Sequence, residues 1–214
     1  MGEPRVTFQQ QLQTIEGKII QLFAFVTEDL AVATEALLSG DASALKVVSE
    51  REAIIDALYQ ELEELLQSLM LLQSPFGTDF RLLISVLRIV PELERSHDLV
   101  EHIAEHATHI LNEELSPRSR GLVHRIGETA EEMWSQAASA WYERDRHAAE
   151  ALEERDDDMD SLHSALVAEL ATGMIALPVV MEMTLVARYY ERLGDHAVNV
   201  ARRVVYLAGR QPHG

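Results

Sequence analysis

Carboxylate side chains that recur four residues apart are the groups in this chain whose type and spacing could do chemistry. Glu191 and Asp195 form one such pair within the segment from Tyr190 to Arg203. The apolar residues of this segment recur at helical spacing, so we expect both carboxylates to lie side by side on one helix face. Neighbouring carboxylates repel each other unless a proton or a cation lies between them, so the pair predicts a cation site.

The same pattern occurs once more, earlier in the chain. Glu94 and Asp98 repeat the spacing, and Arg95 follows the glutamate just as Arg192 does in the later copy. Glu191 follows Glu94 by 97 residues. One such pair is a weak signal, but two at matching places in two long helical segments indicate an internal duplication.

Hydrophobic periodicity and turn residues predict six helices in two groups of three. We expect them over about residues 7–38, 42–72, 79–112, 117–142, 146–175 and 178–208. This order predicts an all-α fold of two tandem three-helix bundles joined end to end. The expected domains are residues 1–113 and 114–214.

The second helix of each group carries another pair of carboxylates four residues apart. The eight predicted metal ligands are therefore Glu52, Asp56, Glu94, Asp98, Asp156, Asp160, Glu191 and Asp195. Hard oxygen donors suit divalent or trivalent metal ions such as iron, Mn, Mg or Ca. The alternative is a solvated acidic face whose charges are partly neutralised by Arg95 and Arg192.

Four histidines lie on the same predicted helix as Glu94 and Asp98. His97 lies between the two carboxylates, and His102, His106 and His109 follow at helical spacing. The latter three could extend the first metal site or form a transition-metal site, but a polar helix face that happens to carry histidine is the simpler interpretation. The second repeat does not duplicate this stripe.

Charge and composition exclude several classes of function. The chain has 36 acidic and 18 basic residues and a net charge of −18, which disfavours binding to nucleic acid or to anionic membranes. It has no cysteine, so disulfides and thiolate metal sites are excluded. We find no apolar run long enough for a signal peptide or a membrane span, and we expect a cytoplasmic protein without membrane insertion. A glycine-rich phosphate loop is also absent, so we do not expect direct phosphate binding.

These motifs resemble those of the PhoU family, which regulates bacterial phosphate uptake. The resemblance covers about residues 7–207 and includes Glu94 to Asp98, Glu191 to Asp195 and the Asp79-Phe80-Arg81 tripeptide. One difference is that Ser96 and His97 stand in the first motif where the second has Leu193 and Gly194. Since glycine allows close helix approach and histidine does not, we expect a wider first site, or one that His97 joins.

The resemblance implies an adaptor rather than an enzyme. PhoU-like proteins act as negative regulators of phosphate-starvation signalling, through the ATPase of the phosphate ABC transporter and through a sensor histidine kinase. Some members hold metal ions on their E-x-x-x-D surfaces. A homodimer is a further expectation.

Two other functions compete with this one. A ferritin-like di-metal carboxylate enzyme needs two E-x-x-H motifs in one four-helix bundle. The chain offers Glu94 with His97 and, less well matched, Asp160 with His163, but these lie in different predicted bundles. The other alternative is a helical scaffold without any ligand.

Overall fold

The structure is a computed structural model that describes residues 3–73, 75–107, 115–173 and 175–209. Six helices account for nearly all of these residues: α1 (Glu3–Ser39), α2 (Ser43–Gln73), α3 (Gly77–Ala107), α4 (Pro117–Glu143), α5 (Ala148–Leu170) and α6 (Leu177–Ala208). They form the two three-helix bundles that the sequence predicts. The expected domain boundary between residues 113 and 114 lies outside the described residues.

Local chemistry explains where α1 ends and where α4 begins. Gly40 adopts a positive φ of 76° and ends α1, as its position in the sequence suggests. The Ser116 hydroxyl accepts a hydrogen bond from the backbone N–H of Ser119, and Pro117 occupies the first turn of α4. These signals lie within a few residues of each helix end and are therefore readable from the sequence.

The expected end of the fifth helix is wrong. We predicted a helix to about Ile175, but α5 ends at Leu170. The Thr172 hydroxyl donates to the carbonyl of Glu169, and Gly173 has a φ of 77°. A residue in this left-handed conformation cannot continue an α-helix, so the chain turns here.

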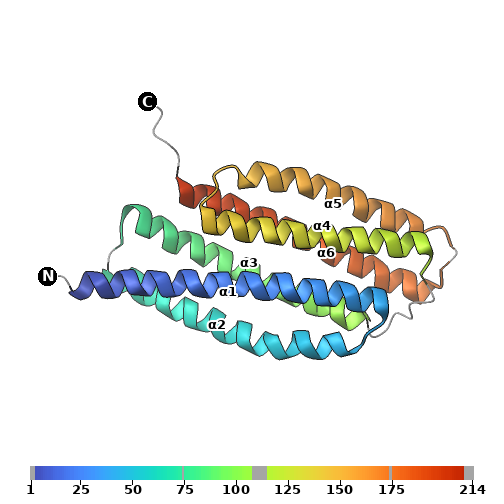
Figure 1. Cartoon of the computed structure of the whole chain (residues 1–214), viewed down its shortest axis with the longest axis horizontal. Coiled ribbons are helices and arrows are strands. Elements are labelled where there is room, and N and C mark those ends of the chain that lie inside the picture. The colour runs from blue at the N-terminus through green and yellow to red at the C-terminus, as the bar shows by residue number, and fades with distance from the viewer. Residues whose placement is uncertain (1–2, 74, 108–114, 174, 210–214) are drawn as a thin grey trace.

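The two bundles lie side by side, not end to end as we expected. Figure 1 shows all six helices along the long axis of the molecule, with α1 to α3 beside α4 to α6. Helix α1 packs against α4, and α3 packs against α6. The reason is that these helices are apolar on more than one face, so a bundle alone would leave part of its apolar surface in water.

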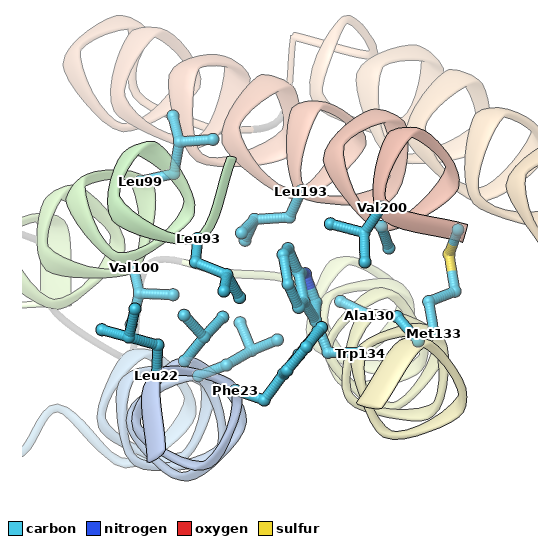
Figure 2. Packing of buried hydrophobic residues seen from close by; sticks show 14 of the residues in the cluster. Leu22, Phe23, Leu93, Leu99, Val100, Ala130, Met133, Trp134, Leu193 and Val200 are labelled. Atoms are coloured by element: carbon cyan, nitrogen blue, oxygen red, sulfur yellow. The ribbon is translucent and has the colours of Figure 1, made fainter. Parts of the chain in front are cut away.

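Both bundles therefore share one hydrophobic core. Figure 2 shows Trp134 reaching from α4 toward Phe23 of α1, near Leu93 of α3 and Leu193 of α6. The rings of Phe23 and Trp134 lie 6.2 Å apart at a tilt of 55°. All four side chains are almost fully buried. Within the part of the chain that the structure describes, no helix has the length and apolarity needed to cross a membrane.

A close contact of α1, α4 and α6 generates a stability prediction. The Thr34 hydroxyl donates to the carbonyl of Leu30 (2.8 Å) and accepts from the hydroxyl of buried Tyr190 (2.8 Å). A Cβ atom on Gly127 would lie 3.0 Å from Thr34 Oγ1 and even closer to Thr34 Cγ2. We expect Gly127→Ala to lower the free energy of unfolding by about 1–3 kcal/mol, because the core is overpacked there.

Gly121 on the same helix provides the matched control. A Cβ atom there would meet nothing within 4 Å, so Gly121→Ala should be neutral or raise stability by up to about 1 kcal/mol through helix propensity. Urea unfolding followed by circular dichroism measures both variants. Equal stability of the two variants would show that the three helices do not pack as closely as described.

Candidate metal centre

The first acidic cluster joins α2 and α3. Burial, followed by the neighbouring carboxylates of Asp98 and Asp56, raises the pKa of Glu94 above its ordinary value, although Arg95 opposes the shift. The pKa of Glu52 is also raised, chiefly by burial and further by Asp98. The four residues predicted from the first repeat therefore interact with one another electrostatically across two helices.

A buried histidine joins this cluster. His97 donates a hydrogen bond from Nδ1 to Oε2 of Glu52 (2.6 Å) and from Nε2 to Oδ2 of Asp29 (2.9 Å). Burial disfavours a charged imidazole, but these two hydrogen bonds outweigh it and raise the pKa of His97 above its ordinary value. Because both ring nitrogens face carboxylate oxygens, the site stabilises the imidazolium form of His97, which carries a positive charge into the cluster.

Asp29 is the site residue that sequence reasoning missed. It is fully buried on α1, where its Oδ1 lies 2.9 Å from Nη1 of Arg51 without hydrogen-bond geometry. The available signal was a lone aspartate within the apolar stripe that contains Val26 and Leu30. Buried carboxylates need a partner, and this one finds His97 on a helix distant in sequence.

The second acidic cluster joins α5 and α6 and contains no such histidine. Burial is the main cause that raises the pKa of Asp156 to about 6, and the carboxylates of Asp195, Asp160 and Glu191 add to it. Asp156 Oδ1 is buried and has no hydrogen-bond partner among the described residues. Asp156 therefore interacts electrostatically with the three other carboxylates predicted from the second repeat.

Gly194 explains how α6 approaches α5 at this point. A Cβ atom on Gly194 would lie 2.7 Å from Asp156 Oδ1 and 3.5 Å from the side chains of Met133 and Met159. The corresponding position of the first repeat holds His97, whose imidazole contacts Asp29 and Glu52. His97 thus contacts Glu52, one of the predicted ligands, whereas Gly194 leaves the second cluster without an imidazole.

The arginines bear on the alternative of a neutralised acidic face. Arg188 pairs with Glu191, and Arg95 pairs with Glu92 (3.2 Å) rather than with a predicted ligand. Among the described residues, no three His, Asp or Glu side chains are placed closely enough to hold a metal ion. The donor set and the unpartnered Asp156 oxygen nevertheless fit a hard cation, which would have to draw the carboxylates together.

The other histidines of the stripe make ordinary contacts between helices. His106 pairs with Glu182, and the His102 ring stacks on Tyr189 at 5.4 Å. His109 lies outside the described residues. These contacts agree with a polar helix face rather than with a transition-metal site.

Comparison with known proteins identifies the family. The protein-family model described as "PhoU domain" matches residues 19–107 and again residues 123–204. The chain belongs to the PhoU family. The two matches coincide with the two bundles, so the internal duplication inferred from the paired motifs is a repeat of the PhoU domain.

Curated PhoU proteins match nearly the whole chain. The chain is 31% identical over 212 residues to "Phosphate-specific transport system accessory protein PhoU homolog 1" of Mycobacterium leprae, which covers 95% of this chain and 93% of that protein. It is 31% identical to PhoU homolog 2 of Mycobacterium tuberculosis, with 95% and 97% covered. These relatives are named accessory proteins, not enzymes.

Solved PhoU structures have the same fold. The crystal structure of PhoU from Pseudomonas aeruginosa superimposes with a TM-score of 0.86 at 27% identity, covering 94% of this chain and 98% of that one. The PhoU structure from Streptococcus pneumoniae gives a TM-score of 0.82 at 23% identity, covering 94% and 97%.

The raised pKa of Asp156 predicts a pH-dependent stability in chelator-treated protein. The folded chain retains the Asp156 proton up to about pH 6, whereas an aspartate with the ordinary pKa of 3.8 releases it earlier. The Asp156 carboxyl group therefore makes its full contribution to the free energy of unfolding below about pH 4. This contribution is lost as the pH rises through about 6. We expect Asp156→Asn to be more stable than the parent at pH 7 by about 1 kcal/mol, since water screens this half-exposed group, and equally stable at pH 4.

Urea unfolding at a series of pH values measures this effect. Asp157→Asn removes an exposed carboxylate next in sequence and should change the pH profile much less. The interpretation of a crowded second cluster would be wrong if both variants changed the profile equally.

Proposed function

We propose that this chain is a regulatory accessory protein of phosphate uptake and phosphate-starvation signalling. The observation that carries the proposal is the match of both repeats to the PhoU domain, together with relatives over 95% of the chain that are named phosphate-specific transport system accessory proteins. In this role the chain acts in the cytoplasm and keeps the starvation response off while phosphate is plentiful. Its partners are the ATPase of the phosphate ABC transporter and a sensor histidine kinase.

The mode of action is contact with partners rather than catalysis. The E-x-x-H residues of the enzyme alternative lie in different bundles, and His97 is already bonded to Asp29 and Glu52. The double bundle offers long helix faces to a partner, and its net negative charge favours a partner with a basic patch.

Deletion of the gene tests the regulatory role. In a deletion strain grown in high phosphate, we expect a starvation-response reporter to be switched on, and a plasmid copy of the gene to restore repression. The proposal fails if the reporter stays repressed in the deletion strain and the genome holds no second copy of the gene. Pull-down with the transporter ATPase and with the sensor kinase then tests each partner.

We propose further that the acidic clusters bind metal ions, with iron, Mn, Mg and Ca as the candidate ions. Two features support this: the oxygen-only donor set of the second cluster and the unpartnered Oδ1 of Asp156. A bound ion would supply positive charge to Asp156, Asp160, Glu191 and Asp195 and so connect α5 with α6. The first cluster, with Glu52, Asp56, Glu94 and Asp98, already contains the imidazolium of His97, so we expect it to bind a cation less tightly.

Metal analysis by mass spectrometry tests this on tag-free protein dialysed against Mn²⁺, Fe²⁺ or Mg²⁺. We expect bound metal in the parent, a loss of most of it in Glu191→Gln/Asp195→Asn, and a smaller loss in Glu94→Gln/Asp98→Asn. Glu150→Gln/Glu154→Gln is the matched control, because it removes two exposed carboxylates four residues apart on α5. Absence of metal from the parent, or equal metal in all variants, would mean that the clusters are only acidic surface.

A further inference from the structure

A pocket rich in arginine lies between α3 and α6, on the seam between the two bundles. Its volume is about 430 Å³, and its wall contains Arg88, Arg95, Arg202 and Arg203. The whole chain has 18 basic residues against 36 acidic ones. Four arginines around one pocket are therefore a strong local exception to the acidic character of the protein.

Two of these arginines are held in place by neighbouring groups. Arg95 donates from Nε to the carbonyl of Pro91 (2.9 Å) and from Nη2 to Oε1 of Glu92 (3.2 Å). Arg202 donates from Nε and Nη2 to Oε1 of Glu153, at 3.0 and 2.7 Å. These bonds reduce the number of conformations that each guanidinium must give up when it binds a ligand.

The other two arginines are not neutralised. Arg88 and Arg203 make no ion pair and no hydrogen bond within the described part of the chain. Glu92 is the one acidic residue in the pocket wall, and it also lies near Asn199 Nδ2 (3.4 Å) and His196 Nδ1 (3.5 Å). The pocket therefore holds more positive charge than its own carboxylate can balance.

We propose that this pocket binds the phosphate group of a small anion, either inorganic phosphate or a small phosphorylated metabolite. Guanidinium groups present several N–H donors in a plane and bind phosphate oxygens in pairs. The pocket volume lies within the usual range for small-molecule sites.

The charge of the rest of the molecule favours a small anion over an extended one. A nucleic acid or a long acidic peptide would run beyond the pocket onto a surface that carries a net charge of −18. A small anion stays within the local field of the arginines, because charges farther away than about 8–10 Å are largely screened at physiological salt.

An anion in this pocket would connect the two repeats. Arg88 and Arg95 belong to α3 of the first bundle, whereas Arg202 and Arg203 belong to α6 of the second. A ligand that binds only the folded chain raises its stability, so the protein should melt at a higher temperature when the pocket is filled. This binding requires neither the acidic clusters nor the regulatory role proposed above, and it contradicts our sequence-based expectation that the chain does not bind phosphate directly.

Isothermal titration calorimetry with inorganic phosphate, and separately with ATP, tests the proposal in a phosphate-free buffer of constant ionic strength. We expect the parent to bind one anion per chain, and Arg88→Gln/Arg203→Gln to bind it at least about tenfold more weakly. The matched control is Arg118→Gln/Arg125→Gln on α4, which removes the same charge away from the pocket and should bind like the parent.

The outcomes separate the two sources of phosphate. Saturable binding of inorganic phosphate would identify the ion itself as a ligand, and binding of ATP alone would point to a phosphorylated metabolite. The proposal is overturned if the folded parent binds neither, if the pocket variant binds as tightly as the control, or if a polyglutamate peptide binds while phosphate and ATP do not. Circular dichroism shows whether the variants fold, and the single variant Arg203→Gln provides a milder change.

Discussion

The apolar contact between the two repeats is the interaction on which the rest of the structure depends. Helices α1 and α3 of the first bundle bury apolar side chains against α4 and α6 of the second, and Trp134 lies in the middle of this contact. Without it, each bundle would expose part of its core to water. The contact also fixes the seam between α3 and α6, where arginines of both repeats line one pocket.

The two repeats have the same frame and different chemistry. Asp29 of the first repeat corresponds to Met133 of the second, and Glu52 corresponds to Asp156, because each residue lies 104 positions before its counterpart. His97 corresponds to Gly194. In the first repeat two carboxylates share the proton-bearing imidazole of His97. In the second repeat Met133 and Gly194 stand where the first has Asp29 and His97, so no histidine lies beside the Asp156 carboxylate. Arg188 pairs with Glu191 of this cluster and not with Asp156. In the first bundle, His97 thus offsets the repulsion between the carboxylates. In the second bundle, protonation of Asp156 or a bound cation would offset it.

Net charge describes the molecule only on average. A charge of −18 argues against extended polyanions as partners. It says nothing about where the few basic residues lie, and four of them line one pocket. The protein thus has an acidic cluster within each bundle and a basic pocket between the bundles, two kinds of surface with opposite charge.

The sequence by itself determined the features that depend on nearby residues. Helical periodicity predicted six helices, Ser116 and Pro117 marked the start of α4, and the spacing of Glu191 and Asp195 revealed the duplication. The end of α5 was missed because Gly173 had to be weighed against an apolar pattern that continues to Ile175.

Only the tertiary structure decided how segments distant in sequence are arranged together. It decided that the two bundles pack side by side and that His97 bonds to Asp29 and Glu52. It also decided that Arg88 and Arg95 of α3 line one pocket with Arg202 and Arg203 of α6. The physical reason is that periodicity shows which face of a helix is apolar, whereas the choice of partner for that face depends on how all the faces can be buried at once.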